Sequence, residues 1–292
     1  AASGSAGSGA AIVATTTIWG DITRQIVDCA GAGQVTTLMP VGADPHDYAP
    51  SSQDVAAMVG ADLVVANGLG LEEGLQKSIE SAQQDGANVF EVAPLLDPIP
   101  FGAEGEHSDE EGEEDHSGED PHVWLDVTRA ATAAALIGAE LAEVTGDGAY
   151  TQCGEDLEAE LTTLHEAVAA TLATVPEDAR ILVTDHDAFG YFADAYGFTV
   201  AGVVIPGGST LAEPSSAELA ELTATVRESG VGAIFANTAN PQALVDALAS
   251  EVGDIEVVPL YVGSLGGPGS GAETYQDMMT ENAQLISEAL RG

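Results

Sequence analysis

Apolar and polar positions along the chain follow two alternating periodicities. Short β-rich apolar runs, such as Ile12 to Ile18 and Leu63 to Ala66, are separated by stretches with apolar residues at helical spacing. Parallel sheets covered by helices on both faces contain buried strands of this kind. The first part of the chain therefore predicts a βα lobe, with further strands at Val35 to Met39 and Val89 to Val92 and helices at Asp21 to Ala30, Ser51 to Val59 and Leu71 to Gln84.

The pattern becomes helical from Val127 through Val144 and again from Ala149 to about Thr174, before Pro176 ends it. In the second stretch an apolar face recurs at three- and four-residue steps, formed by Leu157, Leu161, Leu164, Val168 and Leu172. Strands and helices then alternate again, with strands at Ile181 to Val183, Thr199 to Ile205, Ala233 to Phe235 and Glu256 to Leu260, and a last helix from about Ala272 to Leu290.

We therefore predict an α/β protein with two βα lobes, each containing a parallel sheet, joined by one long connecting helix. The predicted parts are a flexible N-terminal linker at 1–10, an N-terminal lobe at 11–148, the connecting helix at 149–175, and a C-terminal lobe at 176–292.

Charge narrows the choice of partners. The formal net charge is −42, which would repel the phosphates of nucleic acid and anionic lipid surfaces. No apolar run approaches the roughly 20 residues that span a bilayer. The Gly/Ser/Ala-rich opening from Ala1 to Ala10 suits a flexible tether, which would fit an exported protein with a lipid anchor upstream, although a frayed terminus has the same composition.

Cys29 and Cys153 are the two cysteines of the chain. An even pair in an exported protein favours a disulfide, and the alternative is two buried thiols. Because neither cysteine lies in a CxxC or Cys/His spacing, the pair does not predict a cysteine metal site.

Three of the six histidines share a setting. His46 lies in GADPHDY after a predicted strand, His122 lies in DPHVWLD at a loop end, and His186 follows the strand that begins at Ile181 and opens the next helix. Loops at the carboxyl ends of parallel strands form ligand crevices. Imidazole suits zinc, copper or nickel, and each histidine has an aspartate nearby that could fix its tautomer.

These motifs, with HDAFGYFADAYGF and the later SGAETYQDMMTENAQLI, resemble the periplasmic metal receptors of ABC importers for zinc and manganese. The resemblance extends from Ile12 to Leu290. It implies two α/β lobes bridged by a long helix, with the metal between them. It also implies delivery of the ion to a membrane permease from outside the cytoplasm, without any reaction at the ion, and we expect a monomer. The family's first three ligands correspond to His46, His122 and His186.

Manganese receptors of this family usually carry a glutamate where this chain has His186, so the resemblance favours Zn²⁺ as the transported ion. One departure is Gly263 in YVGSL, where many relatives carry an aspartate as the fourth ligand. The fourth ligand is then water, or a carboxylate such as Asp44 or Asp47. A site of three histidines and water also occurs in zinc hydrolases, which keeps that alternative open beside a manganese or iron receptor.

The segment from Ala103 to Asp120 is acidic and contains His107 and His116. Its composition predicts a solvated loop. Zinc receptors of the family commonly have a histidine-containing acidic loop here, which implies a metal-loading role, and a charged insertion without that role is the alternative. Some lipoproteins of the family also contact host molecules, although no residue of this chain points to adhesion.

Overall fold

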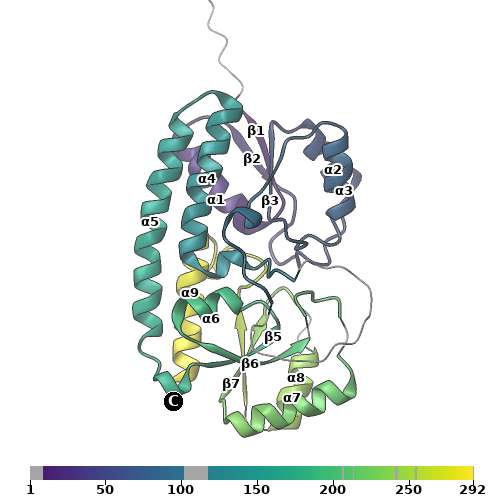
Figure 1. The fold of residues 1–292 in the computed structure, drawn as a ribbon, viewed down its shortest axis with the longest axis vertical. Coiled ribbons are helices and arrows are strands. Elements are labelled where there is room, and N and C mark those ends of the chain that lie inside the picture. Colours follow the sequence, from purple (N-terminus) through teal and green to yellow (C-terminus); the bar gives the residue numbers. More distant parts are fainter. Residues whose placement is uncertain are drawn as a thin grey trace, which may run out of the picture.

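The structure is a computed structural model that describes residues 9–101, 118–205, 207–212, 214–240, 243–253 and 255–291. It contains two parallel sheets of four strands each, in two lobes that lie one above the other in Figure 1. The predicted α/β class with two βα lobes and a long helix is therefore confirmed.

The N-terminal lobe contains β1 (Ala11–Ala14), α1 (Thr17–Ala30), β2 (Gln34–Thr37), α2 (Ser52–Gly60), β3 (Leu63–Ala66), α3 (Gln76–Gln84), β4 (Val89–Glu91) and the 3-10 turn η1 (Ala93–Leu95). The strand order is β2-β1-β3-β4, and all pairs are parallel. Alternate strand residues face opposite sides. Val13 and Val64 pack toward α2 and α3, whereas Ile12 and Val65 pack toward α1.

A helical hairpin links the lobes. It follows the 3-10 turn η2 (Val123–Leu125) and consists of α4 (Val127–Thr145) and α5 (Ala149–Leu172). The two helices approach closely at Gly138 and Gly154, where a Cβ atom on Gly138 would lie 2.6 Å from the carbonyl oxygen of Tyr150. Glycine at this crossing therefore sets the spacing of the hairpin.

The first turns of α5 are fixed to the N-terminal lobe. A disulfide joins Cys29 of α1 to Cys153 of α5, with 5.9 Å between the Cα atoms. Tyr150 Oη also donates a hydrogen bond of 2.6 Å to the carbonyl of Ala32. The other end of α5 leads into the C-terminal lobe, as Figure 1 shows.

The C-terminal lobe contains η3 (Glu177–Ala179), β5 (Ile181–His186), α6 (Gly190–Tyr196), β6 (Thr199–Ile205), α7 (Ser216–Ser229), β7 (Ala233–Asn237), α8 (Ala243–Val252), β8 (Glu256–Leu260) and α9 (Tyr275–Leu290). The strand order is β6-β5-β7-β8, again parallel. Helices α7 and α8 cover one face. One apolar core extends along α1, α4, α5, α6 and α9 and so passes through both lobes.

Several boundaries differ from those predicted. The connecting helix ends at Leu172 and not at 175, because the backbone N–H groups of Thr174 and Val175 bond three residues back in tighter turns before Pro176. The first strand ends at Ala14 and not at Ile18. Thr16 caps α1 by accepting a hydrogen bond from the N–H of Trp19, which starts the helix inside the apolar run.

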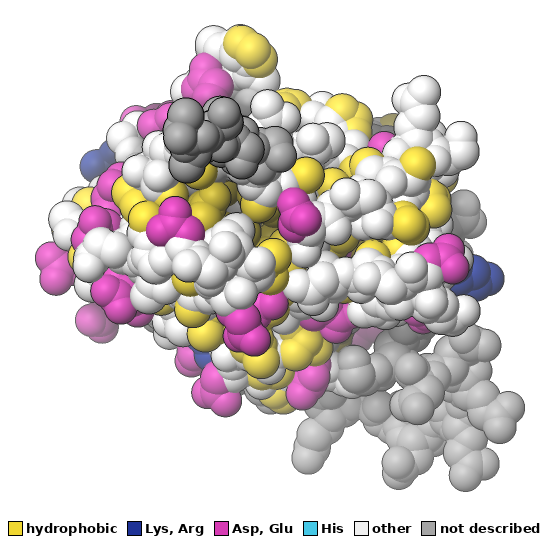
Figure 2. Space-filling model, turned by 90° about the horizontal axis from the view of Figure 1, so that it is seen from above, with side chains coloured by type: hydrophobic (Ala, Val, Ile, Leu, Met, Phe, Trp, Pro, Cys, Tyr) yellow, Lys and Arg dark blue, Asp and Glu magenta, His cyan; other side chains and the backbone are white. Residues whose placement is uncertain are grey.

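Acidic side chains are spread over the surface. Figure 2 shows Asp and Glu side chains scattered across the displayed face without forming one cluster. This distribution agrees with a general acidic surface and does not mark one binding face.

Candidate metal centre

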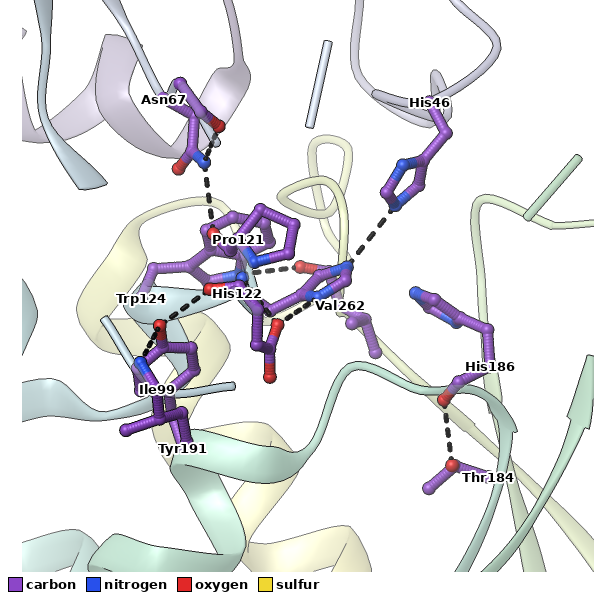
Figure 3. A network of polar contacts seen from close by, with 12 residues as sticks. His46, Asn67, Ile99, Pro121, His122, Trp124, Thr184, His186, Tyr191 and Val262 are labelled. Atoms are coloured by element: carbon purple, nitrogen blue, oxygen red, sulfur yellow. Dashed lines mark hydrogen bonds and ion pairs between the residues drawn. The ribbon is translucent and has the colours of Figure 1, made fainter. Parts of the chain in front are cut away.

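Three buried histidines meet between the two lobes. His46 lies in the loop after β2, His122 immediately precedes η2, and His186 is the last residue of β5. Their exposed fractions are 2%, 1% and 1%. One ring nitrogen of each lies within 4.8 Å of the others, and Figure 3 shows the rings converging from three segments. Buried imidazoles gathered this closely form a geometry suited to a metal ion.

The setting predicted for His186 was wrong in one respect. The residue ends the strand and does not open the following helix, since α6 begins only at Gly190. The backbone pairing with β6 continues as far as His186 and Ile205, so the sheet itself positions this imidazole. The side chain thus extends from the carboxyl end of a central strand, where parallel sheets bind ligands.

Carboxylates orient two of the three rings. Asp120 Oδ1 lies 2.7 Å from His122 Nδ1, and Asp185 Oδ1 lies 3.0 Å from His186 Nδ1. Asp185 is itself held by the backbone N–H of Asn237 and by the side chain of Asn240. A carboxylate on Nδ1 fixes the tautomer and leaves Nε2 as the ligand atom.

The third ring has a looser partner. His46 Nδ1 lies 3.5 Å from Glu73 Oε1, while its Nε2 atom lies 3.3 Å from Nε2 of His122. Two imidazole nitrogens at this distance either share a proton or share a cation. The paired Nε2 atoms therefore define the position at which an ion would bind.

Burial keeps His122 neutral. Desolvation, with further contributions from His186 and His46, lowers its pKa well below the usual 6.5. Burial raises the pKa of Asp120 well above its usual value, whereas hydrogen bonds and the charge of His186 outweigh burial at Asp185 and lower its pKa. Because metal ligation requires an unprotonated ring nitrogen, His122 is in the ligating form at neutral pH.

The segment that carries His122 is bonded to both lobes. From the N-terminal lobe, Asn67 Nδ2 donates a 3.0 Å hydrogen bond to the carbonyl of Pro121. From the C-terminal lobe, Tyr191 Oη donates to Asp120 O (2.6 Å) and Tyr275 Oη donates to Trp124 O (2.6 Å). In the other direction, Trp124 Nε1 of the segment donates to Val262 O of that lobe (2.9 Å). Figure 3 shows the bonds of Asn67, Tyr191 and Trp124 around the His122 ring.

Sequence reasoning did not identify the buried hydrogen-bonded residues around Asn67. The Oδ1 atom of Asn67 accepts a hydrogen bond from Trp19 Nε1, and the backbone N–H of Asn67 donates to Glu72 Oε1. Glu72 also accepts from Thr15 Oγ1, and burial raises its pKa. The only available signal was a polar residue directly after the buried strand β3, which does not reveal these long-range partners.

Neither aspartate considered as a fourth ligand joins the group of ligand atoms, which in the described part of the chain consists of the three histidines. Asp44 instead accepts hydrogen bonds from the N–H of His46 and from Thr210 Oγ1 (2.5 Å), and Asp47 is exposed. Gly263 lies so close to Pro45 that a Cβ atom on residue 263 would be 2.8 Å from Pro45 Cδ. His107 and His116 lie outside the described residues.

Comparisons with known proteins identify the family of the chain. The family described as zinc-uptake complex component A, periplasmic (ZnuA) matches residues 12–289. The chain is a member of the ZnuA family. Its ZnuA-family fold resembles the periplasmic zinc-binding protein TroA from Treponema pallidum, with a TM-score of 0.85 and 28% identity over 97% of this chain and 100% of that one.

Relatives of this ZnuA-family chain differ in the metal they are named for. It is 32% identical to the manganese-binding lipoprotein MntA of Halalkalibacterium halodurans, over 97% of this chain and 89% of that protein. It is also 32% identical to the zinc-binding protein TroA of Treponema pallidum, over 87% and 80%. The coarser part of the prediction is confirmed: the chain is an extracytoplasmic metal-binding receptor of an ABC importer, and the relatives named here are metal-binding transport proteins. Among the described helices, none is long and apolar enough to cross a membrane.

Proposed function

We propose that this receptor captures Zn²⁺ with His46, His122 and His186 and delivers it to the permease of its importer. The observation that carries the proposal is the set of three buried imidazoles whose ligand atoms lie within 4.8 Å. Imidazole nitrogen suits zinc, whereas manganese prefers carboxylate and water oxygen. Tetrahedral zinc sites also accept three protein ligands and one further ligand.

A manganese receptor is the second candidate. It is favoured by the relatives named as manganese-binding, including MntA of Halalkalibacterium halodurans and of Bacillus subtilis, which is 30% identical over 92% of this chain. The donor set opposes it, because the described ligand group contains nitrogen atoms alone. Competition between the two ions at buffered concentrations decides between these candidates.

The deciding experiment compares metal content and affinity in the wild-type protein and in the triple variant His46→Ala, His122→Ala, His186→Ala. We expect one equivalent of zinc in the wild type, not displaced by manganese, and its loss in the triple variant. His165→Ala is the matched control, since His165 stacks on Tyr196 and is not one of the three grouped histidines. Stoichiometric zinc in the triple variant would refute the proposed site.

We also propose that the acidic segment with His107 and His116 collects zinc for this centre. The variant His107→Ala, His116→Ala should keep one equivalent of zinc at equilibrium but take it up more slowly from a dilute buffered source. An unchanged rate of uptake in a stopped-flow competition with a zinc-sensitive dye would assign the segment no loading role.

A further inference from the structure

Three loops between the lobes carry no charged side chain. They are residues 38–43, 207–212 and 261–272, which follow the strands β2, β6 and β8, and we call them the uncharged loops. Charged residues make up 18% of the chain, and all but six of them are Asp or Glu, yet none occurs in these segments. Acidic side chains are spread widely over the surface, as Figure 2 shows for one face. The uncharged loops therefore differ in charge from the acidic surface that is typical of this chain.

Hydrogen bonds join the uncharged loops into one surface. The N–H of Gly42 in the first loop donates a 2.8 Å bond to Ser264 Oγ in the third. Thr210 Oγ1 in the second loop donates a 2.5 Å bond to Asp44 Oδ2, directly after the first loop. The first loop belongs to the N-terminal lobe and the other two belong to the C-terminal lobe. The surface that they form therefore spans both lobes.

This surface lies next to the segments that carry two of the three histidines. Asp44, which accepts the bond from the second loop, also accepts one from the N–H of His46. The carbonyl of Gly207 accepts a bond from the N–H of Asp187, the residue after His186. A partner that covers the uncharged loops would thus contact both lobes beside the centre.

Two exposed apolar side chains belong to the uncharged loops. Val41 is 53% exposed and Leu211 is 52% exposed. Val41 lies beside the third loop, since a Cβ atom on Gly267 would be 3.9 Å from Val41 Cγ1. Among the described residues, Val59 and Leu95 are the other exposed large apolar side chains, and both lie outside these loops. Burial of Val41 and Leu211 against a partner would remove apolar surface from water without placing a charge in the contact.

We propose that the uncharged loops form the surface on which the permease docks, with Val41 and Leu211 as its apolar contacts. This inference rests on delivery to a permease in the proposed function, but not on which ion is carried. Charge favours this partner over two others. A second copy of the chain and an anionic lipid surface share the sign of its net charge of −42 and would be repelled.

The first test measures binding of the zinc-loaded receptor to the permease and ATPase of its importer in phosphatidylcholine nanodiscs. Val41→Asp, Leu211→Asp should bind at least about tenfold more weakly than the wild type, because full burial of one such side chain is worth that much in affinity. Val59→Asp, Leu95→Asp is the matched control. It adds the same charges at exposed apolar positions outside the uncharged loops and should bind like the wild type. Equal losses in the two variants would overturn the proposal.

The second test varies the salt concentration. Affinity of the wild type for the same nanodiscs should stay constant or rise between about 0.1 and 1 M KCl, because screening weakens charge pairs but not apolar contacts. A steep fall in affinity would show that charge pairs hold the complex together, and the proposal would be wrong.

The other possible partners give different results. Equal binding of the wild type to nanodiscs without the importer would assign the surface to the membrane and overturn the proposal. A wild-type dimer in sedimentation velocity that Val41→Asp, Leu211→Asp does not form would assign it to a second copy, with the same consequence.

The outcomes also separate this inference from the proposed function. Zinc content should be one equivalent in the wild type and in both variants, so that weaker docking does not reflect loss of the ion. Failure of the wild type to bind the importer would contradict delivery in the proposed function. Importer binding that is unchanged in Val41→Asp, Leu211→Asp would contradict the docking surface alone.

Discussion

Asn67 provides a test of whether the N-terminal lobe positions a metal ligand through a buried hydrogen bond. Its side chain bonds to Trp19 Nε1 (2.9 Å), Gly68 O (2.9 Å) and Pro121 O (3.0 Å), and the residue is fully buried. In Asn67→Ala the carbonyl of Gly68 keeps a partner, the N–H of Leu71. The indole N–H of Trp19 and the carbonyl of Pro121 lose the partner that Asn67 provides.

The expected loss follows from the two groups left without a bond. Each buried polar group without a partner costs about 1 to 3 kcal/mol, so Asn67→Ala should lower the free energy of unfolding by about 2 to 6 kcal/mol. Urea unfolding of the metal-free protein, followed by circular dichroism, measures this. Zinc affinity should fall as well, because Pro121 precedes His122 and its carbonyl is the point at which the N-terminal lobe holds this ligand.

Trp19→Phe is the matched control. It removes the indole N–H but leaves the bond between Asn67 and Pro121 in place, so it should lower stability while zinc affinity stays near the wild-type value. Equal losses of zinc affinity in Asn67→Ala and Trp19→Phe would refute positioning through Pro121. Such a result would indicate that any weakening of the N-terminal lobe disturbs the centre.

Three further predictions concern the centre and the helix that joins the lobes. Asp185→Asn should weaken zinc binding by about 10- to 100-fold in a competition assay, because it alters the group that orients His186. A zinc affinity equal to that of the wild type would show that the sheet alone positions the ring. In the metal-free protein, the NMR signals of His122 should titrate well below pH 6.5, because burial lowers its pKa. The unfolded chain then binds this proton at a higher pH than the folded chain, so the free energy of unfolding should fall as the pH drops below about 6.5. An NMR titration midpoint near 6.5 would contradict this prediction. Replacing Cys29 and Cys153 with serine should lower the free energy of unfolding by about 4 to 5 kcal/mol, because the disulfide joins residues separated by 124 positions and so closes a long loop in the unfolded chain. An unchanged midpoint of urea unfolding would contradict this prediction.

Much of the fold could be read from the sequence because most of its strands are short, largely apolar runs. Leu63–Ala66, Thr199–Ile205 and Glu256–Leu260 have the predicted bounds. The prediction failed where caps and turns, and not the apolar pattern, set the end of a segment. Helix α3 begins at Gln76 and not at Leu71. Gly68, Leu69 and Gly70 adopt positive φ, and the segment that follows forms tight turns, in which the N–H of Leu75 bonds three residues back to the carbonyl of Glu72.

The grouping of the three histidines was predictable from the sequence, but their surroundings were not. His46, His122 and His186 stand in short motifs whose types and order carry the information. By contrast, Tyr191 reaches Asp120 across 71 positions and Trp124 reaches Val262 across 138, and no local pattern specifies such pairs. The contact of Pro45 with Gly263 likewise depends on how the two lobes meet, which the sequence does not specify locally.

The bonds that hold the His122 segment to both lobes affect how the cargo can leave. Parting the lobes around the ion would strain or break the bonds of Tyr191 to Asp120, Tyr275 to Trp124 and Trp124 to Val262 together, each worth about 0.5 to 1.5 kcal/mol. Spontaneous opening is then a minor population, and an equilibrium shifts only as far as a partner binds one state better than the other. We therefore expect the two lobes to stay together around the ion until docking on the transporter supplies free energy for unloading.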